Sequence, residues 1–401
     1  MKNQIDSLMK DQGIDAILIS GAGDHNPAMQ YLTGGGHFDA NVIKLAGADT
    51  GIYCYPMERE EAARTGLRTT LHHNLRSGIT DLAQEYRWML NEAGLPGGRV
   101  SFYGRVESGR FLALLDELKK IAPEYVFIGE GENPILMEAR TTKEEYEIEH
   151  IRVMGKITTR VVGRVADLLT SRSVHTNYLL NSAGEPLKVG EVKKLINLWL
   201  AEEGAENPEG TIFSIGRDAA IPHNVGNPDD IIELGKTIVF DIYPCEAGGG
   251  YFYDFTRSWC LGYADDPTMK LYTDVKKVYD TVVNELKSGQ LCKDYQNRTC
   301  DLFEEMGHPT IRSHPGTQEG YVHSLGHGLG LDIHEQPWFS TFAETNDRLI
   351  PGGVFTIEPG LYYPDKGMGI RLEDSYRVTS QGKIELLAQF PMDLILPVKK
   401  N

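Results

Sequence analysis

Three histidines lie close together in one glycine-rich stretch of the chain. His323, His327 and His334 fall within residues 323–334, although the whole chain has only 12 histidines. Glycines occupy positions 326, 328 and 330 of the same stretch. A glycine lets the backbone approach a ligand closely, because it has no Cβ atom. This pattern predicts a site at which imidazole side chains bind a ligand.

Two other segments share a pattern of a turn glycine, an apolar strand and a carboxylate. Residues 235–241 read Gly-Lys-Thr-Ile-Val-Phe-Asp, and residues 352–358 read Gly-Gly-Val-Phe-Thr-Ile-Glu. Asp241 and Glu358 each stand six positions after the first glycine of their segment. A buried carboxylate is costly unless it is paired or binds a metal. The repeat predicts a duplicated half-domain that presents two acids to one centre.

A further acid follows each segment on an expected partner strand. Asp254 lies in the segment 251–258, beyond a triple glycine at 248–250, and Glu373 lies in the segment 369–374. Arg371 and Glu373 are two residues apart, so they share one face of a strand. We therefore expect four acids in two hairpin-like pairs. Spacing alone leaves open the alternative of four solvated strand ends.

Four carboxylates with one imidazole form an oxygen-rich, hard ligand set. Such a set favours Mn²⁺, Co²⁺ or Fe²⁺ over zinc, which prefers histidine and cysteine. It would nearly neutralise two divalent ions, and two ions roughly 3.5–4 Å apart activate water and polarise a carbonyl for hydrolysis. A phosphate-binding loop is the rival interpretation of the glycines, but Asp230 stands where its first glycine belongs. There is also no G-x-S-x-G motif for a serine nucleophile.

The elements that must position these residues divide into two expected domains, as the length of 401 residues suggests. Residues 1–138 alternate short strands (16–19 and 100–103) with helices (111–121), and a loop is expected up to residue 34. Thr142 and Glu145 predict a capping box. Apolar residues then recur every three or four positions from Ile148 to Leu168, which predicts a long amphipathic helix opening the domain 139–401.

The sequence of the first domain shows no cluster of residues to which chemistry can be assigned. Its histidines, His25, His37, His72 and His73, are scattered, and we expect them on the surface or in loops.

Composition restricts the class of partner. Acidic residues outnumber basic ones by 57 to 40, and the net charge of −17 opposes binding to nucleic acids or anionic membranes. No apolar run approaches the roughly 20 residues that span a bilayer. The first fifteen residues predict an amphipathic helix and contain no signal-peptide block. Five cysteines without a C-x-x-C pair indicate a reducing compartment, and we expect the cytoplasm.

The acids and histidines described above, in their order along the chain, resemble the pattern of the pita-bread metallopeptidases. This family includes methionine aminopeptidases, Xaa-Pro aminopeptidases, prolidases and creatinase relatives. The resemblance implies an α+β fold: a smaller creatinase-type α/β domain, then a pita-bread domain of duplicated α/β halves with antiparallel sheets flanked by helices. The metal ligands of the family fall on Asp241, Asp254, His327, Glu358 and Glu373.

The resemblance also implies roles for these residues. Asp241 would bind one ion, His327 and Glu358 mainly the other, and Asp254 and Glu373 would bridge the two. Glu358 would also shuttle a proton. The two divalent ions would be Mn²⁺ or Co²⁺ in the first place, with Fe²⁺ or Zn²⁺ as alternatives.

Further matches fall on residues that contact substrate in the family. His334 matches the histidine that steadies the substrate carbonyl, and His223 matches an upstream histidine of the substrate pocket. His323 and Arg371 resemble additions made by the proline-specific branch. That branch implies a homodimer that hydrolyses the bond between an N-terminal residue and proline, as an aminopeptidase or a dipeptidase.

Two departures from the family pattern bear on substrate length. Asp241 and Asp254 are 13 residues apart, two more than expected. No arginine lies between Glu358 and Arg371, where prolidases often clamp a dipeptide carboxylate, and only Lys366 is present there. Longer Xaa-Pro peptides therefore remain open as substrates.

Two other functions remain as alternatives. One is a non-peptidase enzyme of the same fold, either a creatinase-like C–N hydrolase or a lyase acting on a small zwitterion. The intact ligand set opposes the creatinase-like version, because such members lose metal ligands. The other is a non-catalytic binding module, which usually erodes the ligand set and adds basic or disordered tails.

Overall fold

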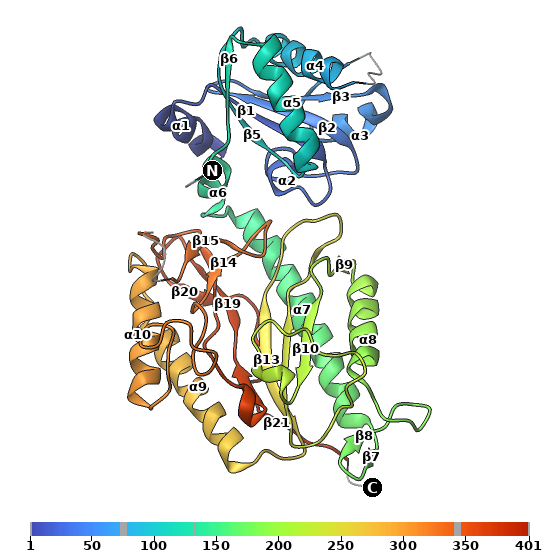
Figure 1. The fold of residues 1–401 in the computed structure, drawn as a ribbon, viewed down its shortest axis with the longest axis vertical. Coiled ribbons are helices and arrows are strands. Elements are labelled where there is room, and N and C mark those ends of the chain that lie inside the picture. The colour runs from blue at the N-terminus through green and yellow to red at the C-terminus, as the bar shows by residue number, and fades with distance from the viewer. Residues whose placement is uncertain (1, 73–77, 132–133, 341–345, 400–401) are drawn as a thin grey trace. The chain divides into compact units, whose positions relative to one another are not determined.

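The chain forms two units in the computed structural model, which describes residues 2–72, 78–131, 134–340 and 346–399. The first unit comprises Met1–Arg140 with Ala247–Gly250, and the second comprises Thr141–Glu246 with Tyr251–Asn401. Figure 1 shows the elements of both units. None of the helices in the described ranges combines the length and the apolar character needed to cross a bilayer.

The first unit contains a six-stranded sheet in the order β4-β3-β2-β1-β5-β6. Only β2 runs antiparallel to its neighbours. The predicted strands 16–19 and 100–103 are confirmed, and both are longer than expected. The strands are β1 (Ala16–Ala22), β2 (Asp39–Leu45), β3 (Thr50–Cys54), β4 (Arg68–Leu71), β5 (Gly98–Tyr103) and β6 (Tyr125–Ile128).

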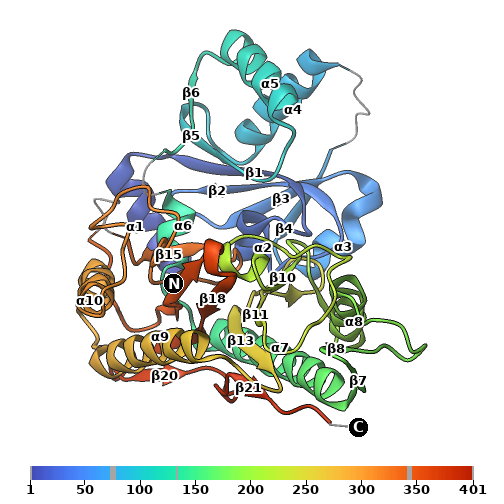
Figure 2. The same cartoon turned by 60° about the horizontal axis from the view of Figure 1, so that its bottom comes forward.

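Helices α4 and α5 cover one face of this sheet (Figure 2). Leu18 of β1 packs in the same apolar layer as Tyr86 of α4 and Leu118 of α5. The predicted helices near the N-terminus and at 111–121 are confirmed as α1 and α5. The helices of this unit are α1 (Lys2–Gln12), α2 (Pro27–Thr33), α3 (Arg59–Arg64), α4 (Ile79–Glu92), α5 (Ser108–Ile121) and α6 (Ile135–Arg140).

One expectation for the first unit is wrong. The expected loop before residue 34 contains α2, because the Asn26 side chain accepts from the Met29 N–H and Pro27 occupies the first turn. His72 lies in the loop directly after β4, as expected, and it is buried there: its Nδ1 lies 2.5 Å from Oε1 of Glu85 on α4. His37 is exposed and His25 is half-buried, whereas His73 lies outside the described residues.

The second unit opens with the predicted long helix, α7 (Glu145–Ser171). The expected apolar positions from Ile148 to Val165 are buried. The predicted capping residue is wrong, since the N-cap is Glu144. Its side chain accepts from the backbone of Glu147, and the Glu147 side chain accepts from the Glu144 N–H at 2.8 Å. Thr142 instead forms a β-bridge with Gly353.

The remainder of this unit has two similar halves (Figure 1). In the first half, α7 and α8 (Val189–Glu202) pack together and precede a sheet with the order β10-β11-β13-β21. In the second half, α9 (Asp266–Glu285) and α10 (Cys292–Glu305) pack together and precede the sheet β15-β14-β16-β19-β20.

Short strands make up these sheets and the connections between them. The first half contains β7 (Val174–His175), β8 (Tyr178–Leu179), β9 (Ala205–Glu206), β10 (Thr211–Ile215), β11 (Thr237–Ile242), β12 (Cys245–Glu246) and β13 (Phe255–Leu261). The second half contains β14 (His327–Gly328), β15 (Glu335–Trp338), β16 (Val354–Ile357), β17 (Gly360–Tyr363), β18 (Met368–Arg371), β19 (Asp374–Val378) and β20 (Ile384–Leu386), and β21 (Ile395–Leu396) ends the chain beside β13.

The predicted repeat corresponds to one central strand in each half. Gly235 and Gly352 have φ of 71° and 86°, so both turns need the left-handed conformation that glycine tolerates. β11 follows the first turn and β16 the second. The expected single strand 369–374 is wrong, because it divides into β18 and β19, which belong to different sheets.

Candidate metal centre

A cavity of about 420 Å³ in the second unit is lined by every side chain that the sequence nominated for the site. These residues come from both halves of the unit, across more than 150 residues of sequence. They are His223, Asp241, Asp254, His323, His327, His334, Glu358, Arg371 and Glu373.

Antiparallel pairing brings the acids of each half to the same end of their strands. Asp241 lies near the end of β11, and Asp254 immediately precedes β13, whose residue Thr256 pairs with Asp241. In the second half, Glu358 immediately follows β16 and Glu373 immediately precedes β19. An antiparallel hairpin places the end of one strand beside the start of the next, so each pair of acids faces one point.

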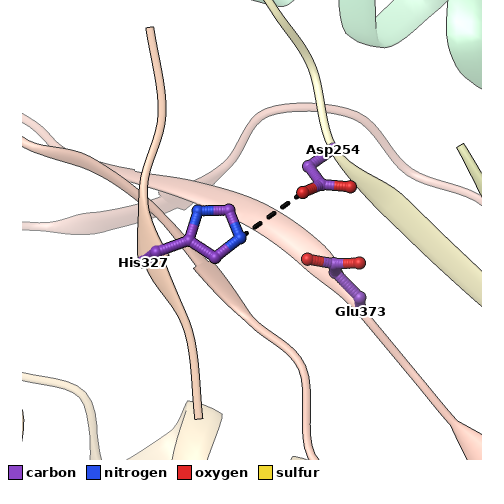
Figure 3. A group of neighbouring side chains, drawn as sticks. All are labelled: Asp254, His327 and Glu373. Carbon is purple, nitrogen blue, oxygen red and sulfur yellow. Dashed lines mark ion pairs between the residues drawn. The ribbon is translucent and has the colours of Figure 1, made fainter. Parts of the chain in front are cut away.

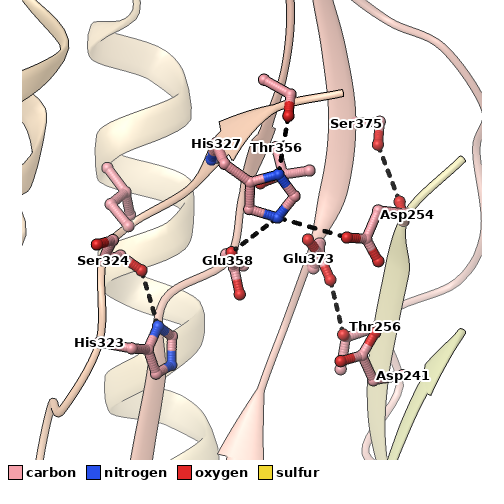
Figure 4. A network of polar contacts seen from close by, with 12 residues as sticks. Asp241, Asp254, Thr256, His323, Ser324, His327, Thr356, Glu358, Glu373 and Ser375 are labelled. Atoms are coloured by element: carbon pink, nitrogen blue, oxygen red, sulfur yellow. Dashed lines mark hydrogen bonds and ion pairs between the residues drawn. The ribbon is translucent and has the colours of Figure 1, made fainter. Parts of the chain in front are cut away.

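Three of these residues form a compact donor set. One ligand atom from each of Asp254, His327 and Glu373 lies within 4.8 Å of the others (Figure 3). The Nε2 atom of His327 is 3.5 Å from Oδ2 of Asp254 and 3.5 Å from Oε1 of Glu358 (Figure 4). Carboxylate oxygens from both halves therefore surround one imidazole nitrogen.

The imidazole of His327 is held in the form that binds a metal. Its Nδ1 lies 3.0 Å from the carbonyl oxygen of Gly328, which can only accept, so Nδ1 carries the proton. Burial lowers the pKa of His327, so the ring is neutral near pH 7. The lone pair of Nε2 then faces the carboxylates. The backbone N–H of His327 donates to Oγ1 of Thr356 at 3.1 Å.

The carboxylates are buried with oxygens left unsatisfied. Oδ1 of Asp241 and Oε1 of Glu373 are buried and have no hydrogen-bond partner among the described residues. Burial raises the pKa of Asp254, Glu358 and Glu373 well above the usual range, and the charge of the neighbouring acids raises it further. Buried, unpaired oxygens of this kind need a cation. The donor set therefore fits hard divalent ions.

One oxygen of Asp241 already has a cationic partner. Its Oδ2 lies 2.5 Å from a terminal nitrogen of Arg371, which is 3% exposed. The other terminal nitrogen of Arg371 donates to the Tyr362 hydroxyl at 2.7 Å. Arg371 thus neutralises part of the charge at Asp241 and leaves Oδ1 open.

His323 is tied to Arg371 through Tyr362. The Nδ1 atom of His323 lies 2.7 Å from the carbonyl oxygen of Ser324, and its Nε2 lies 2.9 Å from the Tyr362 hydroxyl. Burial, with a contribution from Arg371, lowers the pKa of His323 to about 3. The neutral ring therefore donates from Nδ1 and accepts the Tyr362 proton at Nε2.

His334 and His223 line the cavity from exposed positions. The ring of His334 lies 4.4 Å from the ring of His327, centroid to centroid. His223 follows the short helix η2 (Asp218–Ala220). Lys366 does not line the cavity, and its ammonium group lies over the ring of Tyr363 instead.

Several residues of the site were not predicted. Thr256 donates to Oε2 of Glu373 at 2.7 Å, and Thr356 receives the His327 N–H. Thr356 lies within the repeated segment, two positions before Glu358, and Thr256 lies in the partner segment, two positions after Asp254. Tyr362 has no comparable signal. The cavity is also lined by Glu209, Tyr243, Ile333 and Trp338.

Comparison with known proteins agrees with this geometry. The model of metallopeptidase family M24 matches residues 149–380. A Xaa-Pro dipeptidase of Pyrococcus horikoshii is 27% identical over 96% of this chain and 95% of its own length. A solved Xaa-Pro dipeptidase of Bacillus anthracis has a TM-score of 0.77 and 23% identity, covering 98% of each chain. The X-Pro aminopeptidase of Thermotoga maritima has a TM-score of 0.75 and 23% identity, covering 98% of this chain and 100% of its own.

The fold and the cavity define a metal-dependent peptidase. The chain belongs to metallopeptidase family M24, and the predicted family and fold class are confirmed. Members of this family depend on divalent metal ions.

Proposed function

We propose that this enzyme hydrolyses the peptide bond between an N-terminal residue and proline. The proposal is supported by relatives of nearly full length that are named Xaa-Pro dipeptidases. It is supported as well by His323 and Arg371, the two residues that resemble additions of the proline-specific branch, which line the cavity together. The single observation that carries it is the convergence of three buried acids, the half-buried Glu358 and His327 on that cavity.

We assign the five ligands as follows. Asp241 would hold one ion, His327 and Glu358 would hold mainly the other, and Asp254 and Glu373 would be shared between them. The ions are Mn²⁺ or Co²⁺ in the first place, with Fe²⁺ or Zn²⁺ as alternatives. When bound, the ions supply an activated water and a polarised substrate carbonyl.

The side chains of the chain carry the remaining chemistry. The carboxylate of Glu358, which lies beside His327, accepts a proton from the attacking water. The imidazole of His334 donates an N–H to the substrate carbonyl oxygen as negative charge develops there. His223 and His323 form walls of the pocket. Arg371 orients Asp241 and, through Tyr362, His323.

Other features complete the proposal. We assign 1–138 as a creatinase-like domain and 139–401 as the catalytic domain, and we infer a homodimer. All five cysteines are buried free thiols, which fits a reducing cytoplasm. Because Lys366 stays away from the cavity, no described cation between Glu358 and Arg371 lines it to clamp a dipeptide carboxylate. Longer peptides with proline at the second position are therefore substrates as well.

The test is turnover of the enzyme reconstituted with Mn²⁺ or Co²⁺ on three sets of peptides. They are Xaa-Pro dipeptides, tripeptides beginning Xaa-Pro, and matched peptides with alanine in place of proline or with N-terminal methionine. We expect release of the first residue from both proline sets and little from the others. Arg371→Met should reduce the ratio of kcat/KM for the proline peptides to kcat/KM for the matched alanine peptides. Cleavage of the alanine peptides at the same rate, or conversion of small zwitterions without peptide cleavage, would contradict the proposal.

A further inference from the structure

The first unit contains a second cavity, of about 300 Å³, that the peptidase chemistry does not use. It is lined by Ser20 of β1, by Tyr55 just after β3 and by His72 just after β4. These three strands are parallel, so the cavity lies at their carboxyl ends. From β1 the chain proceeds to β2 on one side, whereas β5 pairs with β1 on the other. Ligands of open α/β sheets bind at such a point.

The layer between the sheet and its helices changes from apolar to polar at this edge. Leu18 lies in the apolar core, but Ser20, on the same face of β1, is a buried polar residue. Its hydroxyl donates to Oδ1 of Asn41, the residue opposite it on β2, at 2.7 Å, and lies 2.8 Å from the Tyr86 hydroxyl. Polar groups in a buried layer cost stability, so their concentration beside a cavity indicates recognition.

His72 is the central polar group of this cavity. Its side chain is 6% exposed, and its Nδ1 lies 2.5 Å from Oε1 of Glu85, which is 3% exposed. The ring also packs against Tyr55, with 4.1 Å between centroids. Neither ring nitrogen has a hydrogen bond among the described residues, although Nδ1 faces the carboxylate of Glu85. In the tautomer that carries its proton on Nδ1, beside the Glu85 carboxylate, Nε2 is an acceptor for an N–H group of a ligand.

Size and charge restrict the ligand. At about 30 Å³ for each water-sized volume, the cavity holds roughly ten non-hydrogen atoms. Leu82 and Phe111 supply apolar walls. Arg110 and Asp39 line the cavity from exposed positions, and neither side chain has a partner within the described part of the chain. One free cation, one free anion and an apolar wall fit a small zwitterion.

We propose that the first unit binds a free α-amino acid with an apolar side chain in this cavity. The carboxylate of the ligand pairs with Arg110, since a guanidinium binds a carboxylate through two parallel hydrogen bonds. The ammonium group donates to Nε2 of His72 and is attracted by Asp39. The side chain packs on Leu82 and Phe111. This assignment rests on the cavity alone and goes beyond the proposed peptidase activity.

The test is hydrogen–deuterium exchange of the metal-loaded, full-length enzyme with L-leucine. We expect exchange to slow in peptides that cover 79–92 and 108–121, the two helices that border the cavity. L-Leucinamide lacks the carboxylate and N-acetyl-L-leucine lacks the ammonium group. Each should therefore need a concentration at least about tenfold higher than that of L-leucine to slow exchange equally. Because the readout is local to the first unit, it is independent of peptide hydrolysis.

Two variants and a control complete the test. Arg110→Met keeps an apolar stem at an exposed position, so it should fold normally and weaken leucine binding about tenfold or more. His72→Gln should weaken it similarly. Lys119→Met, on an exposed part of the same helix as Arg110, should bind leucine as the wild type does. The proposal is overturned if leucine protects neither helix, if it protects only the second unit, if leucinamide binds equally well, or if Arg110→Met has no effect.

Discussion

The two halves of the catalytic unit present matching pairs of acids in different electrostatic surroundings. In the first half, Asp241 is paired with the guanidinium of Arg371 at 2.5 Å. In the second half, the partner of Glu358 is His327 at 3.5 Å, and burial lowers the pKa of that imidazole, so it brings no positive charge. The two halves therefore share the placement of their acids but not the charge around them.

This difference between the halves shows which acids lack a positively charged partner in the protein. Asp241 is partly neutralised by direct contact with Arg371, whereas among the described residues no lysine or arginine forms an ion pair with Asp254, Glu358 or Glu373. Their pKa values are raised, first by burial and then by one another. Bound cations should consequently matter most for these three acids, and substitutions in the two halves should not be equivalent.

Asp254→Asn should have the largest effect. The change removes one charge from the centre without altering the size of the side chain, and metal-derived stabilisation of several kcal/mol corresponds to a loss of about 10³-fold or more in kcat/KM. Asp280→Asn is the matched control, because Asp280 is exposed and pairs only with Lys276 on the surface of α9. Wild-type kcat/KM in Asp254→Asn at saturating metal would contradict the assignment of Asp254 as a metal ligand.

Glu358→Gln should follow, with a loss of about 10²–10⁴-fold in kcat from removal of a proton acceptor. The amide oxygen still offers a donor to a metal, so metal content should fall less than in Asp254→Asn. Steady-state kinetics and metal analysis of the two variants separate the roles. Equal loss of metal in both variants would contradict a distinct proton-transfer role for Glu358.

Two threonines provide a matched pair of smaller changes, one in each half. Thr256→Val removes the donor to Glu373, and loss of such a supporting hydrogen bond typically costs 10–100-fold in metal affinity or activity. Thr356→Val leaves the His327 N–H without an acceptor, which should lower the free energy of unfolding by about 1–3 kcal/mol. The loss of activity should be smaller than in Thr256→Val. Metal titration and urea unfolding distinguish them. The reverse order of effects on metal affinity would contradict the assigned contacts.

The smallest effect concerns pH and thermal stability. In the metal-free chain, the raised pKa values of Asp254, Glu358 and Glu373 favour the protonated folded state. This contribution is fully present below the ordinary carboxyl pKa and is lost as pH rises through the raised values. Metal requires the deprotonated ligands. The gain in Tm from added Mn²⁺ should therefore increase from pH 5 to pH 8, and a constant or shrinking gain would contradict the account.

Much of the site was predictable because its pattern is local. Gly235 and Gly352 both occupy left-handed turns, so the same short motif marks the start of each central strand and the acid that follows it. The apolar spacing of α7 was similarly local. The cap was misplaced by two residues because Glu144 and Glu147 form the same reciprocal contacts as the expected threonine and glutamate.

The remainder depended on contacts between distant residues. Tyr362 reaches His323 and Arg371 only because β17 pairs with β18, where it lies opposite Gly369. His72 is buried because α4 brings Glu85 beside the end of β4. Neither side chain stands in a periodic or repeated pattern, and therefore local spacing could not indicate its environment.

The most direct test of the metal centre is the number of ions bound by the folded chain. After reconstitution with Mn²⁺ and removal of free metal, elemental analysis should give two ions per wild-type chain, two per Asp280→Asn chain and fewer than one per Asp254→Asn chain. A wild-type chain that retains no ion, or an Asp254→Asn chain that retains as many as the wild type, would contradict the assignment.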